Sequence, residues 1–272
     1  MSKQGSSLKD ALQNVFATSA ILIAFIVAEI LFSQVMGNPV NFEGGNHAGK
    51  ALEGNYLGMV YKGGQIVPIL MTCILVLLVF IIERTITLSR AKGKGRLNTF
   101  VSQLQGLLAA DKIEEAMEAC DQQKGSLANV MKAGLLRYRD LQKDKELEKD
   151  QKILSIQKSF EEATALELPM LSKNMVIFST LASISVLIGL IGTVLGMIRA
   201  FGALAQSGAP DSLALATGIS EALINTAFGI SGSTLSIIAF NYFSSMIDGY
   251  TFKIDEAGFS LTQNFAASLK TN

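Results

Sequence analysis

Two threonines stand at matching positions in the last two long apolar stretches of the chain. Thr193 lies 11 residues before Leu204, and Thr226 lies 13 residues after Leu213. If these stretches are antiparallel helices joined by a short turn, a rise of about 1.5 Å per residue places both hydroxyls at a similar depth. In an oligomer they would form two polar rings at one level. A hydroxyl exchanges hydrogen bonds without changing its charge, so a proton path lined by threonines also needs a titrating carboxylate.

Glu221 is the only acid in these two stretches, about 12 Å inside the second one at the usual helical rise. An ionisable residue in such a place is a functional candidate, although it can also be a boundary carboxylate that reaches water or caps a helix. Asn225 follows at i+4, where it can hydrogen-bond Glu221. Either Glu221 titrates or a partner helix supplies the carboxylate, which predicts a partner. Glu29, in the first apolar stretch, has fewer polar neighbours and favours a structural interpretation.

Small residues recur in the same two stretches. Gly192 and Gly196 form a small-xxx-small pair, which lets membrane helices approach closely. Gly189 and Gly229 are expected to serve the same packing. Packing alone can account for any one of the small or hydroxylated residues here. Arg199, at the end of its stretch, is expected to be interfacial.

Four stretches are each long enough to cross a bilayer, which requires about 20 mainly apolar residues. The first favours a retained span over a cleaved signal, because it is about 20 residues long and no small-x-small site follows. The sequence therefore predicts an all-α membrane protein of four transmembrane helices, with long helices extending into a cytoplasmic helical domain. The expected order is a cytoplasmic N-terminal segment (1–14), a transmembrane helix (15–36), an external loop (37–65), a transmembrane helix (66–91), the cytoplasmic helical domain (92–172), a transmembrane hairpin (173–250) and a cytoplasmic C-terminal tail (251–272).

The distribution of Lys and Arg sets the expected orientation. Arg90, Lys92, Lys94 and Arg96 follow the second span, whereas the turn at 202–212 contains neither residue type. Both termini are therefore expected in the cytoplasm. Hydrophobic residues make up 49% of the chain, charged residues 17%, and the net charge is zero, so a nucleic-acid partner is not expected. A single histidine and two separated cysteines, Cys73 and Cys120, predict no metal site, disulfide or cofactor.

The segment 92–172 has apolar positions at helical spacing, with a break at Gly125–Ser126. A stripe that begins near Leu147 runs directly into the third span and predicts one very long helix, with a kink at Pro169. The charged run 137–152 alternates in sign. It is typical of a solvated helix surface, and a docking surface for a cytoplasmic partner is the alternative.

Two motifs stand out, GLIGTVLGMIRAF at 189–201 and GISEALINTAFG at 218–229. With ERTITLSRA after the second span and DKIEEAMEACDQQKGSLANVMKAGLL in the inner segment, the chain resembles the MotA/TolQ/ExbB proton-channel family over about residues 66–250. The motifs are most similar to those of ExbB. The chain departs from the family pattern in having Val186 and the segment 231–234 where prolines are common, and in its extra first helix.

The resemblance implies a homopentamer in the bacterial inner membrane, with the third and fourth spans lining a central pore. Two copies of an ExbD-like single-span subunit, each with one aspartate, would sit in that pore. Thr193 and Thr226 match the family's pore threonines and Glu221 its glutamate. The implied function is not enzymatic: proton flow would energise a TonB-like protein for outer-membrane transport.

Alternative functions are a TolQ-like or gliding-type motor subunit and a non-conducting membrane assembly scaffold. A secondary transporter would need related halves, and the first two spans differ sharply in polarity from the last two.

Overall fold

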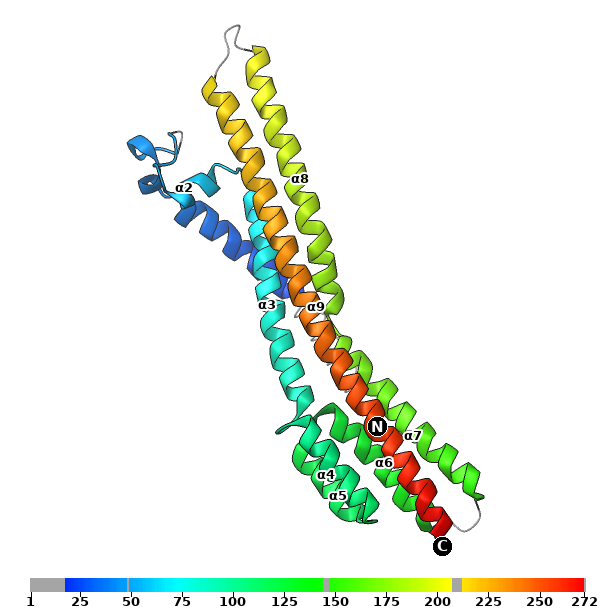
Figure 1. Cartoon of the computed structure of the whole chain (residues 1–272). Helices are drawn as coiled ribbons and strands as arrows, with labels where there is room; N and C mark the ends of the chain where they lie inside the picture. Colours follow the sequence, from blue (N-terminus) through cyan, green and yellow to red (C-terminus); the bar gives the residue numbers. More distant parts are fainter. Residues whose placement is uncertain (1–17, 48, 144–146, 207–211, 272) are drawn as a thin grey trace. The chain divides into compact units, whose positions relative to one another are not determined.

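The computed structural model describes residues 18–47, 49–143, 147–206 and 212–271 (Figure 1). Its elements are helical, and among the described residues the extended pairing is limited to an isolated antiparallel bridge between Phe42 and Ala51. The predicted N-terminal segment 1–14 and part of the turn before the last span lie outside these ranges.

Four helices are long and apolar enough to cross a membrane, which confirms the predicted all-α, four-span fold class. The first is Thr18–Met36, and its last turns, Leu31–Met36, are π-helical. The others contain α3 (Ile66–Lys92), α8 (Met175–Gln206) and α9 (Ser212–Thr271). Their outward faces carry large exposed apolar side chains, as expected of helices whose surroundings are lipid or other helices.

The chain divides into two compact units. The first contains the described residues up to Ile81 together with Val176–Phe240, and the second contains Ile82–Met175 and the described part of 241–272. The helices α3 and α9 each contribute residues to both units.

In the first unit, residues 37–65 form a folded segment around Asn41. The Asn41 side-chain amide donates to the carbonyls of Val35 and Met36, at 2.8 and 2.9 Å, and so satisfies the C-terminal end of the first helix. Its Oδ1 accepts a hydrogen bond from Asn55, whose own Oδ1 caps the next helix. The short helices in this segment are η2 (Pro39–Asn41), η3 (Glu43–Gly45) and α2 (Tyr56–Tyr61).

The second unit is a helical domain with its own apolar core. It contains α4 (Leu97–Ala109), α5 (Ile113–Gln123), α6 (Gly125–Lys143) and α7 (Lys149–Ser172). The predicted break at Gly125–Ser126 is confirmed, because α6 begins at Gly125, where the backbone has positive φ. A further break, at Asp111, where φ is 55°, separates α4 from α5 and was not expected from the apolar spacing.

The last turns of α9 belong to this core, which differs from the tail expected at 251–272. Phe265 stacks edge-on against Tyr138 of α6 with ring centroids 4.6 Å apart. Gly134 of α6 lies so close to Leu261 that an added Cβ would approach its Cδ2 to 2.6 Å. The buried positions recur every three or four residues along α9, at Ile254, Ala257, Leu261 and Phe265. The continuous helix therefore packs into the domain as far as Phe265.

The prediction of one unbroken helix from Leu147 through the third span is wrong. The chain leaves the helix at Lys173, where ψ is 141°, and Asn174 has a φ of 63°. Pro169 lies inside α7, so the interruption comes just after it. Asparagine tolerates this left-handed conformation better than most residues, which makes Asn174 a suitable link between the helices.

A buried arginine holds this break against the end of α3. Arg84 is 1% exposed, forms a two-pronged pair with Glu83, and donates to the carbonyl of Leu171 at 3.3 Å. Asn174 also donates to Glu83, at 3.4 Å. The interaction satisfies a C-terminal carbonyl of α7, because a helix leaves its last four carbonyls without intrahelical partners.

The contact between α9 and α7 can be tested with a double-mutant cycle at Gly258 and Phe160. An added Cβ on Gly258 would meet the Phe160 ring, so Gly258→Ala is expected to destabilise the domain by about 1–3 kcal/mol through overpacking. In a Phe160→Ala background the same change should be close to neutral, because the ring that it meets is gone. Thermal unfolding of the four proteins measures the coupling. Equal costs of Gly258→Ala in both backgrounds would contradict the packing.

Candidate functional site

Within the first unit, α8 and α9 lie side by side, with glycines at their contact (Figure 1). A Cβ on Gly189 would approach the Asn225 carbonyl oxygen to 2.9 Å and the Gly229 Cα to 3.1 Å. A Cβ on Gly196 would come within 2.8 Å of the Ala222 nitrogen. Because these neighbours are backbone atoms, they cannot move aside as a flexible side chain would. The two helices therefore approach as closely as glycine allows.

Thr193 and Thr226 meet at this contact. Their hydroxyls are in direct hydrogen-bonding contact, and each also lies 3.2 Å from a backbone carbonyl one turn earlier in its own helix. Because each hydroxyl has a single proton, one donates to a backbone carbonyl while the other donates across the contact. Thr193 further approaches the Ala222 carbonyl at 3.4 Å. Both side chains are half-buried. The structure thus places the two hydroxyls at one depth, as their distances from the turn predict.

Glu221 points to a different neighbour. Its carboxylate pairs with the Arg199 guanidinium of α8, and it lies against Gly64, just before α3. The two side chains are unequally covered, at 8% exposure for Glu221 and 56% for Arg199. Gly64 has a φ of 76°, so its backbone and the space beside Glu221 both favour glycine. The chain thereby compensates a carboxylate inside an apolar helix with a cation of its own.

Asn225 does not hydrogen-bond Glu221, so that expectation is wrong. Its amide nitrogen instead donates to the carbonyl of Gly63 at 2.9 Å. Its Oδ1 is buried without a hydrogen-bond partner in the described structure. Gly192 leaves room for this side chain, since an added Cβ would lie 2.5 Å from the Asn225 Cβ. Glu221 and Asn225, one turn apart, thus both contact the Gly63–Gly64 turn.

The four predicted polar residues therefore separate into two pairs. Thr193 and Thr226 lie between α8 and α9, while Glu221 and Asn225 face the start of α3. Sequence reasoning missed Gly63, Gly64 and the pairing of Arg199. The consecutive glycines at 63 and 64, immediately before an apolar span, are the signal that a close approach was needed there.

Glu29 of the first helix is exposed, and its helix packs through Ala28 and Phe32 against Val67 and Met71 of α3. In the described part of the chain, no group of three or more His, Cys, Asp or Glu side chains is arranged to hold a metal.

Comparison with known proteins gives a consistent picture. Residues 122–256 match the model of the MotA/TolQ/ExbB proton channel family. This chain carries a MotA/TolQ/ExbB family domain. The match contains α6, α7, α8 and most of α9, including all four polar residues above, and it does not extend back to Ile66, where the resemblance in the sequence was expected to begin.

Three curated relatives illustrate the similarity. A putative biopolymer transport protein ExbB-like 3 of Synechocystis is 36% identical over 90 residues, which is 32% of this chain and 43% of that protein. The biopolymer transport protein ExbB of Pseudomonas putida is 31% identical over 81 residues, or 30% and 25% of the two chains. The Tol-Pal system protein TolQ of Pseudomonas aeruginosa is 29% identical over 116 residues, or 43% and 50%. The chain thus spans half or less of the length of each of these relatives.

The glycine contact predicts which substitutions separate α8 from α9. Gly189→Ala should destabilise the protein by about 1–3 kcal/mol, because its new Cβ meets backbone atoms. Gly202→Ala, in the same helix, meets nothing within 4 Å and should be neutral or slightly stabilising, since alanine favours helix more than glycine does. Thermal unfolding in detergent compares the two. Equal stabilities of the two variants would show that the helices are not held at this distance.

Proposed function

We propose that this chain is the channel-forming subunit of a proton-motive-force-driven motor in a bacterial inner membrane. The observation that carries the proposal is the hydroxyl pair Thr193–Thr226, which lies inside the matched family domain. The pair lies at the contact between two closely packed helices. Protons crossing the membrane there would release about 2.3 kcal/mol per charge for each 100 mV.

The exposed surface of α8 supports an oligomer as part of the proposal. Large apolar side chains remain exposed along one side of α8, at Leu187, Leu190, Ile191, Val194 and Ile198. Five copies of the chain would bring α8 and α9 around a central pore and cover part of this surface. Two ExbD-like single-span subunits, each with one aspartate, would occupy the pore. Their carboxylates would supply the titrating group that a threonine path requires.

Glu221 is the carboxylate that this chain itself offers to the path, together with Asn225. In the structure Arg199 holds it as an ion pair, so a proton that reached Glu221 would weaken that pair. Both the Arg199 contact and the Gly64 contact would then change together. Glu221 is accordingly proposed as the outer step of the path, with the hydroxyl pair further in.

The energised partner is proposed to be a TonB-like protein that acts on outer-membrane transport, with both termini of this chain in the cytoplasm. A TolQ-like subunit is the second candidate, because proteins named TolQ match the chain as ExbB proteins do. A gliding-type motor and a non-conducting scaffold differ from these in cargo and in the absence of proton flow, respectively.

Replacing Thr193 by valine separates a conducting role from a scaffolding role. The chain and a candidate ExbD-like subunit are purified together and reconstituted into vesicles that contain a pH-sensitive dye. Thr193→Val keeps the side-chain shape but removes the hydroxyl, so proton flux should fall by about 100-fold, which corresponds to a barrier that is roughly 2.7 kcal/mol higher. Thr193→Ser, which keeps a hydroxyl, should retain most of the flux.

Native mass measured on the same samples should give five copies of the chain with the partner bound in every variant. Thr262→Val, which removes a hydroxyl bonded to Gly258 in its own helix, is the matched control and should leave the flux unchanged. Unchanged flux in Thr193→Val would support the scaffold instead. A native mass that corresponds to a monomer or dimer without bound partner would contradict the proposed motor function.

The role of Glu221 is tested by Glu221→Gln in the same vesicles. Glutamine has nearly the same shape and accepts a hydrogen bond from Arg199, but it does not titrate. If Glu221 is part of the path, flux should be lost while the pentamer and its thermal stability are retained. If this variant keeps the wild-type proton flux, Glu221 is not part of the proton path. The titrating group would then be the aspartate of the ExbD-like subunit.

A further inference from the structure

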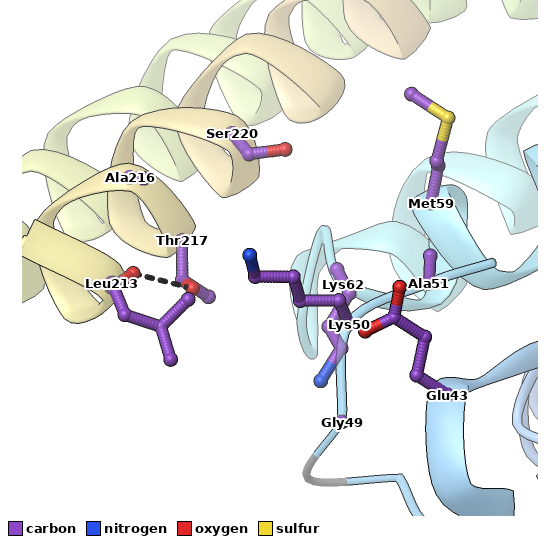
Figure 2. Close-up of a pocket in the computed structure, with 10 residues that line it drawn as sticks. All are labelled: Glu43, Gly49, Lys50, Ala51, Met59, Lys62, Leu213, Ala216, Thr217 and Ser220. Carbon is purple, nitrogen blue, oxygen red and sulfur yellow. Dashed lines mark hydrogen bonds between the residues drawn. The ribbon is translucent and has the colours of Figure 1, made fainter. Parts of the chain in front are cut away.

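A cavity of about 490 Å³ lies between the 37–65 segment and the first turns of α9 (Figure 2). One wall consists of Glu43, Gly49, Lys50, Ala51, Met59 and Lys62, and the other of Leu213, Ala216, Thr217 and Ser220. All of these residues belong to the first unit. The volume falls within the range of small-molecule sites, which is roughly 300–1,000 Å³.

The charges around the cavity favour an anion. Lys50 and Lys62 contribute two ammonium groups, against a single carboxylate from Glu43. The opposite wall adds the hydroxyls of Thr217 and Ser220 and comes from the beginning of a 60-residue helix. The N-terminus of such a helix carries a partial positive charge. The Thr217 hydroxyl donates to the Leu213 carbonyl at 2.8 Å, so the two ammonium groups and the Ser220 hydroxyl are the donors that suit a phosphate (Figure 2).

The lysines are held in place by the fold of the 37–65 segment. The Lys62 ammonium donates to the His47 carbonyl at 2.6 Å and lies 5.4 Å from the centre of the Phe42 ring. Phe42 in turn packs edge-on against Tyr61, with centroids 5.4 Å apart. Burial lowers the pKa of Lys62. Since its ammonium has three donors, the His47 carbonyl leaves two for a ligand.

Lys50 is fixed through its backbone. Its carbonyl accepts a hydrogen bond from the Glu43 nitrogen at 2.9 Å, next to the bridge between Phe42 and Ala51. The Lys50 side chain is exposed at the cavity and takes no part in the aromatic cluster formed by Phe42 and Tyr61. The position of the Lys62 ammonium is therefore set before any ligand arrives, which lowers the ordering cost of binding, while the Lys50 side chain can adjust to the ligand.

The depth of the cavity and its apolar residues identify the source of the phosphate. The apolar stretch of α9 begins at Leu213, so the cavity lies where a membrane-spanning helix leaves the hydrocarbon for the headgroup layer. Leu213, Ala216 and Met59 give the lining an apolar side next to the charged one. We propose that the cavity binds the phosphate headgroup of an anionic phospholipid from the leaflet that faces the 37–65 segment. This site is separate from Thr193, Thr226 and Glu221 and does not depend on proton conduction.

Native mass spectrometry of the full chain in detergent tests the proposal. Phosphatidylglycerol is added in steps, and phosphatidylcholine and inorganic phosphate are added in parallel. The chain should bind one tight phosphatidylglycerol per copy, in clear preference to phosphatidylcholine. Since each lysine near an anionic headgroup is worth about a fivefold change in affinity, Lys50→Gln/Lys62→Gln should weaken this binding by roughly 25-fold. Glu43→Gln should strengthen it.

Lys149→Gln/Lys158→Gln is the matched control, because it removes two exposed lysines of α7 and should leave the tight binding unchanged. Lys62 takes part in the aromatic cluster, so Lys50→Glu provides a second variant that leaves that cluster intact. It should weaken binding about as much as the double variant while the melting temperature stays that of the wild type. Wild-type binding in Lys50→Glu, or equal binding of the two lipids, would overturn the proposal. Displacement of the lipid by inorganic phosphate at equal concentration would also overturn it, because the site would then take the free ion.

Discussion

The close approach of α8 and α9 is the constraint on which the membrane part of this protein depends. Helices in a bilayer gain little from hydrophobic contact with each other, because lipid tails are as apolar as leucine. They associate through close packing and through hydrogen bonds between them. Gly189, Gly196 and Gly229 allow the packing, since their missing side chains bring one backbone against the other. The hydroxyl contact between Thr193 and Thr226 is possible only at that separation.

The polar groups of these helices are satisfied in a way that connects three segments of the chain. Threonine hydroxyls in a helix satisfy themselves on the carbonyl one turn earlier, so they add polarity at low cost. Asn225 has no such local partner for its amide and reaches the Gly63 carbonyl before α3. Glu221, at the next turn, is paired with Arg199 and rests on Gly64. One face of α9 is thus fixed to α8, and the adjoining face is fixed to the start of α3.

Much of the fold could be predicted from the sequence, because length and hydropathy are sufficient to identify four spans and helical spacing identifies the helices between them. The depth of Thr193 and Thr226 could be predicted because a regular helix converts residue number into distance. The partner of Asn225 could not, since Gly63 is 162 residues away and nothing local marks the contact. The break at Lys173–Asn174 was missed for a similar reason. The apolar stripe continues across it, and it is stabilised by Arg84 and Glu83 from α3. The last turns of α9 have a polar composition typical of a tail. That they are partly buried is evident only from the structure, in which one set of their side chains faces α6 and α7.

The unequal exposure of Glu221 and Arg199 determines what each of them can do. A carboxylate that is 8% exposed has lost most of its water, and it keeps its charge at an acceptable cost only while a cation remains beside it. An arginine that is 56% exposed can leave the pair and remain solvated or interfacial. Loss of the arginine therefore costs more than loss of the glutamate, although both break the same ion pair. The ion pair therefore serves mainly to keep the Glu221 charge at its contact with Gly64, and it joins α8 to α9 at the same point.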